Sequence, residues 1–333
     1  MNKRTAAFLI AIVVVIGGAF IGIKKHRPVE ETSSEVRTQI QDYFSSWSPF
    51  QEEDVLVPGD HENRIAVLSV EGAITGSGGI SLDGGSYNHA NFMGELQTVY
   101  DDPTVKAVFL TVNSPGGGVY ESREIRDAIQ KIRTEKKIPV YVYMKNMAAS
   151  GGYYISAETD KIIASPETLT GSIGVIMQSI NYKGLLDKYG VKFQVFKSAA
   201  KKDILSPTRE MTDDERAVMQ SLIDNSYARF LKVVSDGRKI PIEKLKPIAD
   251  GRIYDGDQAK AIGLVDVLAN REEALDMLKQ EQNLEDAEVF CYTSTNDLFK
   301  QFFGALGSKS ELGQIIGLPK ANSSLMYIYE GAL

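Results

Sequence analysis

Strand-like and helix-like segments alternate through the middle of the chain, and this order constrains the fold more than any other feature of the sequence. Short apolar runs typical of buried strands lie at 64–70, 105–112 and 139–144, and stretches with helical periodicity lie between them at 92–100 and 119–132. Parallel strands need a crossover connection, which is usually a helix. The sequence therefore predicts an α/β fold with a mainly parallel sheet and crossover helices.

Later segments continue this pattern and add a helical extension. Further short strands are expected at 161–164, 174–177 and 191–196, with a helix around Leu185 and Leu186 between the last two. A long amphipathic helix is expected at 213–234, because acidic residues at its start complement the helix dipole. A weaker α/β tail is expected at 252–292.

The N-terminus contains a segment typical of a membrane anchor. The uncharged apolar run from Ala6 to Ile23 spans about 27 Å as a helix, and the core of a bilayer measures about 30 Å. A cleaved signal peptide is the alternative, but no clean Ala-x-Ala site ends the run, and basic residues follow it at once. We therefore expect an uncleaved transmembrane helix within residues 1–27. The basic flanks are nearly balanced, so charge alone leaves the orientation open.

Residues 28–63 form an expected linker between the anchor and the globular region. The segment is polar and acidic, with aromatic side chains at Tyr43, Phe44, Trp47 and Phe50. It is either a solvated tether or a tether with an amphipathic piece that lies on the membrane or on a neighbouring subunit.

Composition excludes several classes of function. Of the 333 residues, 43% are hydrophobic and 24% are charged, so the chain can bury a large core. The net charge of −7 argues against a nucleic-acid partner, which needs clustered lysine and arginine. The single cysteine, Cys291, excludes an internal disulfide and a cysteine-based zinc site. We expect neither a metal nor a cofactor.

A candidate nucleophile, Ser150, follows the apolar run 139–144 within the segment Asn-Met-Ala-Ala-Ser-Gly-Gly-Tyr-Tyr. Small residues on both sides let the chain turn sharply and let a substrate carbonyl approach backbone amides. The alternative is an ordinary helix N-cap. The three histidines, His26, His61 and His89, lie upstream of this segment, so a base other than imidazole is expected.

A second strand-end loop is rich in glycine, in the segment Val112-Asn-Ser-Pro-Gly-Gly-Gly118. Its bare backbone amides are suited to an oxyanion hole. A phosphate-binding loop is not expected, because neither the Walker lysine spacing nor the Gly-x-Gly-x-x-Gly fingerprint is present. A purely structural turn is the alternative.

Several motifs, in this order, resemble the S49 family of serine proteases, the signal peptide peptidases, in its short single-domain form. They are Ser114-Pro-Gly-Gly-Gly, Met147-Ala-Ala-Ser-Gly-Gly-Tyr-Tyr, Thr170-Gly-Ser-Ile-Gly-Val-Ile, Lys202-Asp-Ile-Leu-Ser-Pro and Asp255-Gly-x-x-Ala-x-x-x-Gly-Leu-Val-Asp266. The resemblance implies a ClpP/crotonase fold, a Ser/Lys dyad, and degradation of remnant signal peptides and other hydrophobic peptides after secretion. It gives a peptidase domain at 64–292 and a C-terminal tail at 293–333.

The resemblance also implies which residues form the dyad. Ser150 matches the nucleophile, and Lys202 matches the general base of single-domain members. Longer members carry their lysine in a segment similar to Phe196-Lys-Ser-Ala, so Lys197 is the alternative base. A lysine acts as a base when desolvation lowers its pKa from about 10.4 toward about 7 to 8.

Further features follow from the same resemblance. The amides of Gly117 and Gly151 match the oxyanion donors, and Ser172 matches the serine that orients the lysine. The alternative for Ser172 is a turn hydroxyl. Family members form homo-oligomers in which neighbouring protomers share active sites. They are single-pass proteins of the cell membrane, with a cytoplasmic N-terminus and an extracellular catalytic domain.

Two expectations concern how peptides bind. Hydrophobic substrates imply apolar pockets, for which Tyr153 is a candidate. Residues 323–333 resemble a peptide that such a protease binds, so this segment is expected to plug the site, to be trimmed, or to dock as a terminal strand.

Two other classes of function compete with a protease. An acyl-CoA enzyme of the crotonase type shares the expected fold and needs acidic groups at the strand ends, for which Glu121 and Glu167 are the candidates. A noncatalytic membrane scaffold needs neither Ser150 nor Lys202.

Overall fold

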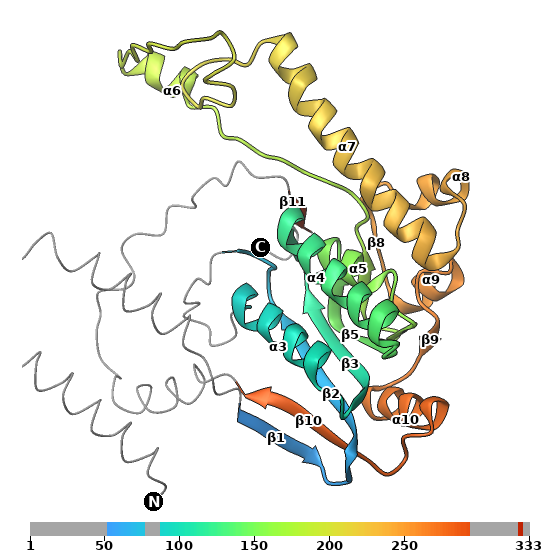
Figure 1. Ribbon diagram of the computed structural model, residues 1–333. Helices are drawn as coiled ribbons and strands as arrows, with labels where there is room; N and C mark the ends of the chain where they lie inside the picture. The colour runs from blue at the N-terminus through green and yellow to red at the C-terminus, as the bar shows by residue number, and fades with distance from the viewer. Residues whose placement is uncertain (1–51, 77–86, 294–325, 329–333) are drawn as a thin grey trace, which may run out of the picture. The chain divides into compact units, whose positions relative to one another are not determined.

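The computed structural model describes residues 52–76, 87–293 and 326–328 (Figure 1). The expected membrane anchor and most of the expected linker lie outside these ranges. Within them, no helix is both long enough and apolar enough to cross a membrane.

A nine-stranded, mainly parallel sheet lies at the centre of the described residues, which confirms the predicted α/β class. Its main path is β1 (Glu52–Val57), β10 (Ala287–Thr293), β2 (Asp60–Glu71), β3 (Val105–Ser114), β5 (Val140–Ala149), β6 (Lys161–Ala164) and β9 (Val267–Leu268). Two short strands lie off this path: β7 (Leu169–Gly171) pairs with the last residues of β5, and β8 (Ile253–Tyr254) pairs with β7. The β1–β10 and β7–β8 pairs are antiparallel, and the other pairs are parallel.

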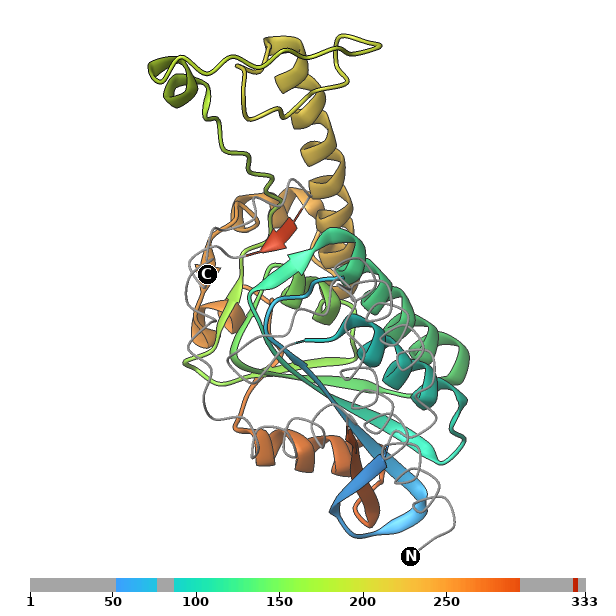
Figure 2. The ribbon, with the colours of Figure 1, turned by 90° about the vertical axis from the view of Figure 1, so that its left-hand side faces the viewer.

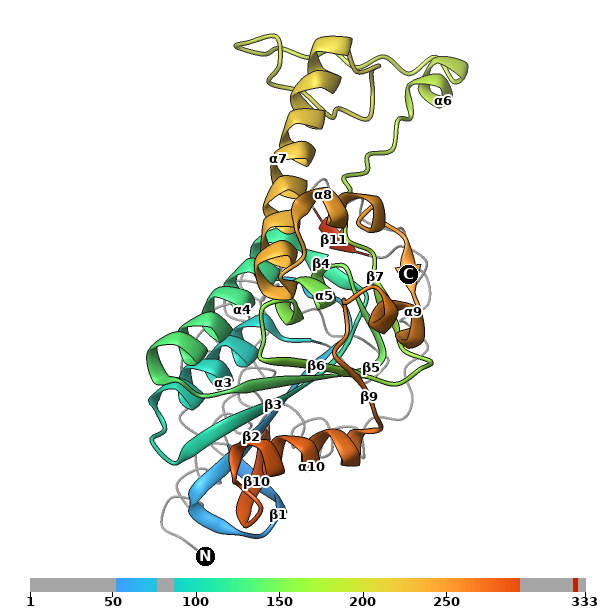
Figure 3. The same ribbon diagram turned by 90° about the vertical axis from the view of Figure 1, so that its right-hand side faces the viewer.

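Helices cover both faces of this sheet (Figures 2 and 3). On one face lie α3 (His89–Asp101) and α4 (Val119–Lys131), which continues as a π-helical turn (Ile132–Lys136), and on the other lies α10 (Arg271–Gln282). Side chains of β2 alternate between the two apolar cores, as the two-residue period of a strand requires. Ala66, Leu68 and Val70 pack on the α3 side, and Ile65 and Val67 pack on the α10 side.

The remaining helices lie near the ends of the strands. They are α5 (Gly151–Ser156), α6 (Lys183–Lys188), α7 (Asp213–Arg238), α8 (Ile242–Leu245) with a 3-10 turn (Lys246–Ile248), and α9 (Gly256–Ala261). The long helix α7 begins at a capping box, in which the side chains of Thr212 and Glu215 each accept a hydrogen bond from the other residue's backbone amide. The predicted acidic start of this helix is confirmed.

One part of the chain stands away from the sheet, and we call it the arm (residues 178–225). It comprises α6, its flanking loops and the first half of α7, and all three views show it projecting from the strand ends (Figures 1, 2 and 3). Large apolar side chains on it are exposed: Ile180, Tyr182, Leu185, Tyr189, Val191, Phe193, Val195, Phe196, Val218 and Leu222. Phe196 is the extreme case, at 95% exposure.

Some predicted boundaries were wrong. Residues 191–196 form no strand, because a strand needs a neighbour for its backbone hydrogen bonds and these exposed residues have none among the described parts of the chain. Residues 174–177 form no strand either, although Ile176 makes a single bridge to Met326. Ordered strands begin at Glu52, inside the expected linker. The expected tail at 252–292 joins the main sheet, since β10 lies beside β2.

Candidate active site

Ser150 lies at the sharp turn where β5 ends and α5 begins. Its backbone dihedrals are φ 53° and ψ −112°, a conformation that residues with a Cβ rarely adopt. Such strain costs about 1–3 kcal/mol and persists where the surroundings hold it in place. Here the Ser150 amide donates to the Gly171 carbonyl at 2.8 Å, and its own carbonyl accepts from the Tyr154 amide at 2.8 Å. The side chain makes no capping bond, so the ordinary N-cap interpretation does not describe this serine.

The glycine-rich loop lies beside this turn as the short strand β4 (Gly116–Gly118). Ile74 donates its amide to the Gly116 carbonyl and accepts the Gly118 amide at its carbonyl, both at 2.8 Å. Backbone groups of successive strand residues alternate in direction, so the amide of Gly117 faces away from Ile74. Gly116 has φ 100°, which favours glycine, and its amide donates to the Ser114 hydroxyl at 3.1 Å.

A short strand from the C-terminal region, β11 (Met326–Ile328), lies on the free edge of β4. The two strands are antiparallel, with Tyr327 opposite Gly117. On the other edge of β11, Met326 and Ile176 exchange backbone hydrogen bonds of 3.0 and 3.1 Å. The segment is therefore held between two stretches of backbone, as a peptide is when it binds by strand addition.

The carbonyl oxygen of Tyr327 lies between the two glycine turns. A Cβ built on Gly116 would lie 2.0 Å from this oxygen and 2.5 Å from the Gly151 amide nitrogen. A Cβ built on Gly151 would lie 3.0 Å from the same oxygen. Side chains at either glycine would therefore displace the carbonyl. Gly117, which pairs with Tyr327, and Gly151 thus both lie close to this carbonyl oxygen, at the turn that carries Ser150.

The side chain of Tyr327 enters an aromatic site formed by α5 and α7. Its ring centroid lies 4.9 Å from that of Tyr154 and 4.6 Å from that of Phe230, and it is fully buried. Its hydroxyl donates to the Ser226 carbonyl at 3.2 Å, and burial raises its pKa. We predicted Tyr153 as a lining residue. That was wrong: its hydroxyl donates to the Leu264 carbonyl inside the core, at 2.9 Å.

Ser172 lies next to Ser150 because β5 and β7 end together. Ala149 pairs with Gly171, so the residue after each strand lies at the same edge of the sheet. Ser172 has φ 48° and is nearly buried, and its amide donates to the Arg252 carbonyl at 2.8 Å. The structure thus brings Ser150, Ser172, Gly117 and Gly151 together.

The candidate lysines lie elsewhere, on the arm. The Nζ of Lys197 donates to Asp203 at 2.6 Å and to the Ala200 carbonyl at 2.9 Å, so this lysine is ion-paired. Lys202 is exposed, and its Nζ makes no hydrogen bond or ion pair within the part of the chain that the structure describes. Neither lysine contacts Ser150 of its own chain, so one chain by itself does not assemble the predicted dyad.

Other candidate acids and bases are engaged away from Ser150. His89 forms hydrogen bonds with Tyr87 at 2.6 Å and with Glu124 at 2.9 Å. His61 forms one with Glu288 at 2.9 Å. Two carboxylates were the candidates for acyl-CoA chemistry. Glu121 packs against Gly118, and Glu167 is exposed with its pKa lowered by a hydrogen bond from Ser165. Within the described residues, no group of three or more His, Cys, Asp or Glu side chains is arranged to hold a metal ion.

Comparisons with known proteins identify relatives of this chain. Residues 132–285 match the model of peptidase family S49. The chain is 43% identical to the "Putative signal peptide peptidase SppA" of Enterococcus faecium, over 93% of this chain and 89% of that protein. It is also 38% identical to "Protease 4" of Salmonella typhi, over 66% of this chain and 34% of that longer protein. "Serine protease SPPA, chloroplastic" of Arabidopsis thaliana is 28% identical over 67% of this chain and 33% of that protein.

These matches define a serine protease. The chain belongs to peptidase family S49. The competing interpretations as an acyl-CoA enzyme or a noncatalytic scaffold are therefore set aside.

Proposed function

We propose that this serine protease hydrolyses remnant signal peptides and other hydrophobic peptides at a membrane, with a Ser150/Lys202 dyad shared between neighbouring protomers. The observation that carries the proposal is the backbone of Tyr327, whose carbonyl oxygen lies between the glycine turns beside the strained Ser150. A peptide bond held in this way is exposed to attack by a hydroxyl.

The proposed reaction is acyl transfer to Ser150. Its Oγ attacks the substrate carbonyl carbon while the neutral Nζ of Lys202 takes the hydroxyl proton. The amides of Gly117 and Gly151 then donate to the oxyanion. The lysine ammonium returns the proton to the leaving amine as the C–N bond breaks. A water molecule, deprotonated by the same lysine, hydrolyses the acyl-enzyme. Ser172, at the adjoining strand end, orients the lysine.

The C-terminal segment supports the choice of an extended hydrophobic substrate. Peptide backbone pairs with β4 on one side and Ile176 on the other, and an aromatic side chain fits against Tyr154 and Phe230. These are features that a signal-peptide fragment satisfies, because such fragments are apolar. Relatives named as a signal peptide peptidase and as Protease 4 support the same class of substrate.

The arm supports a site shared between protomers. It carries Lys202 away from the Ser150 of its own chain, and it exposes several large apolar side chains. A second copy of this chain is the proposed occupant of that surface, because docking buries the apolar side chains and brings a lysine to each serine. Burial at such an interface also favours the neutral form of an amine, which a general base requires.

The fold and location belong to the same proposal. The mainly parallel sheet with flanking helices is compatible with a ClpP/crotonase fold. The apolar run from Ala6 to Ile23 would anchor the protein in the cell membrane, with the N-terminus in the cytoplasm and the catalytic domain outside.

An activity-based probe tests the central role of Ser150. Assembled protein should react with a fluorophosphonate at Ser150 and cleave a hydrophobic peptide, and Ser150→Ala should do neither. Mass spectrometry adds a test of the substrate-like C-terminus. Active protein should end at Tyr327, whereas Ser150→Ala should keep the residues that follow. Labelling and cleavage that survive in Ser150→Ala would refute the proposal.

A further inference from the structure

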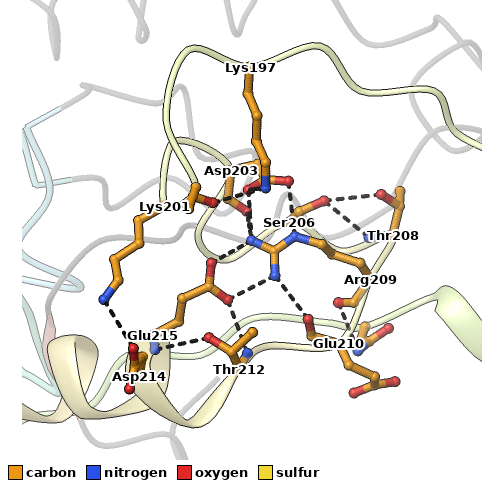
Figure 4. A network of polar contacts seen from close by, with 12 residues as sticks. Lys197, Lys201, Asp203, Ser206, Thr208, Arg209, Glu210, Thr212, Asp214 and Glu215 are labelled. Atoms are coloured by element: carbon orange, nitrogen blue, oxygen red, sulfur yellow. Dashed lines mark hydrogen bonds and ion pairs between the residues drawn. The ribbon is translucent and has the colours of Figure 1, made fainter.

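The loop that carries Lys202 is tied to the start of α7 by a polar network, drawn in Figure 4. Asp203, the residue directly after Lys202, accepts two hydrogen bonds from Arg209, Nε to Oδ2 at 2.9 Å and one terminal nitrogen to Oδ1 at 2.7 Å. The same guanidinium donates to Glu215 at 2.8 and 2.6 Å. Lys197 donates to Asp203 from the other side, at 2.6 Å. Arg209 therefore bridges the lysine loop and the helix.

The helix end of this bridge is firmly held. Glu215 is 2% exposed and lies in the first turn of α7. Its carboxylate accepts from the Thr212 amide at 3.0 Å, and its own amide donates to the Thr212 hydroxyl at 3.3 Å. The Oε2 atom of Glu215 is therefore held by Thr212 as well as by Arg209. A bidentate pair between arginine and carboxylate adds directional specificity to this contact.

The loop end of the bridge is held by hydrogen bonds, among them local backbone bonds such as that from the Lys202 amide to the Ala199 carbonyl at 3.2 Å. Residues 191–202 are exposed, so no buried apolar cluster defines their path. Arg209 also donates to the carbonyls of Asp203 at 3.1 Å and Glu210 at 2.9 Å. These contacts fix both the side chain and the backbone of the residue that follows Lys202.

The network also balances charge around Lys202. The two cations Lys197 and Arg209 face the two anions Asp203 and Glu215. Hydrogen bonds from Arg209 and then from Lys197 hold the pKa of Asp203 well below its usual range, so its charge is already paired. The ionisable groups near the loop are Lys197, Lys201, Asp203, Arg209, Asp214 and Glu215, and Lys201 faces Asp214 at 3.9 Å. An unpaired carboxylate beside Lys202 would instead stabilise its ammonium form.

We propose that Arg209 is a positioning residue for catalysis, which fixes the loop that presents Lys202 and keeps the adjacent carboxylate of Asp203 paired. The proposal rests on the role of Lys202 as the general base. It assigns to Arg209 no contact with substrate.

The pH dependence of kcat/KM tests this role. If Arg209 were merely structural, substitutions of Arg209 and Asp203 would not shift the pH profile in opposite directions. Arg209→Met removes one of the two cations paired with Asp203 and the cation paired with Glu215, so the limb on which activity rises with pH should shift upward by about one pH unit. Asp203→Asn removes the charge of Asp203 and leaves both cations, so the same limb should shift downward. Arg209→Lys should restore part of the activity at pH 7 that Arg209→Met loses, a loss of about tenfold or more.

A matched control and a fallback keep the test sharp. Arg216→Met removes an exposed arginine that follows Glu215 in α7, and it should leave the pH profile of kcat/KM unchanged. If Arg209→Met fails to assemble, the nearly isosteric Asp203→Asn decides the question by its downward shift. Profiles of Arg209→Met and Asp203→Asn that match Arg216→Met, or that shift in the same direction, would overturn the proposal. Lys202→Ala is assayed beside them: an active Lys202→Ala instead refutes the dyad itself.

Discussion

The arm and the rest of the described chain, which we call the body (residues 52–76, 87–177, 226–293 and 326–328), carry the two halves of the proposed active site, and they are stabilised in opposite ways. In the body, Ser150 and the glycine turns are held by buried backbone hydrogen bonds between neighbouring strands. On the arm, the loop that carries Lys202 is held by the ion pairs of Arg209 with Asp203 and Glu215, at the start of α7. In the proposed site, the nucleophile would therefore be preorganised within one chain, whereas the base would come from the arm of a second chain.

Removal of the base should have the largest effect. Lys202→Ala should lower kcat/KM by at least about 10³-fold, since the dyad loses its proton acceptor. Lys201→Ala, a neighbour with a long ion pair, should stay within about threefold of wild type. Peptide-cleavage kinetics on assembled protein distinguish them. If Lys197→Ala is the inactive variant and Lys202→Ala is not, Lys197 is the base.

A change in the body should have the next largest effect. Gly151→Ala should lower kcat by about 10²-fold, because its Cβ would lie 2.7 Å from the Ser122 hydroxyl and 3.0 Å from the Tyr327 carbonyl oxygen and so displace the oxyanion site. Gly174→Ala is the control, since its Cβ would meet only ordinary contacts from 3.5 Å. Equal rates for the two variants would exclude Gly151 as an oxyanion donor.

A substitution in the aromatic site around Tyr327 should lower kcat/KM moderately, by an amount that depends on the substrate. Tyr154→Ala should lower kcat/KM by about tenfold for peptides with tyrosine before the cleaved bond, because an aromatic pair contributes about 0.5–1.5 kcal/mol. Peptides with alanine there should lose less. Tyr120→Ala, at an exposed tyrosine of α4, is the control. A uniform loss across both peptides would show that Tyr154 does not select substrates.

Lowering the pH should have the smallest effect of these changes. The arm should keep its stability near neutral pH and lose part of it in acid. Arg209 lowers the pKa of Glu215 to about 2 and that of Asp203 below its usual range. Carboxylates with depressed pKa values stabilise the fold above their unfolded values of about 4, and this stability is lost as pH falls through the folded values. Hydrogen exchange in the arm, corrected for intrinsic rates, should therefore be constant from about pH 6 to 9 and rise below about pH 4. A change near pH 7 would contradict this account of the network.

Much of the body was predictable from sequence, because local pattern and tertiary structure agree there. Apolar runs became buried parallel strands, and the turn at Ser150 lies where β5 ends and α5 begins. The arm was not predictable in the same way. Residues 191–196 have the apolar content of a strand, but no neighbouring strand within the described parts of the chain completes their hydrogen bonds.

The pairing of segments that are distant in the sequence could not be predicted from local sequence patterns either. The C-terminal segment was recognised as peptide-like, yet its register on β4 depends on Ile74, Gly116 and Gly118 occupying the opposite edge of that strand. Tyr153 and Tyr154 differ only in direction around a short helix, so composition gave no basis for choosing the one that meets Tyr327. The capping box at Thr212 and Glu215 was a readable signal for the start of α7.

Complementation between inactive subunits tests the central claim, that body and arm of different chains form one site. Ser150→Ala and Lys202→Ala proteins are mixed under conditions that exchange subunits, and mixed oligomers are verified by mass. A shared site predicts that peptide cleavage returns in proportion to interfaces that pair an intact serine with an intact lysine. Verified mixed oligomers without activity would contradict the account.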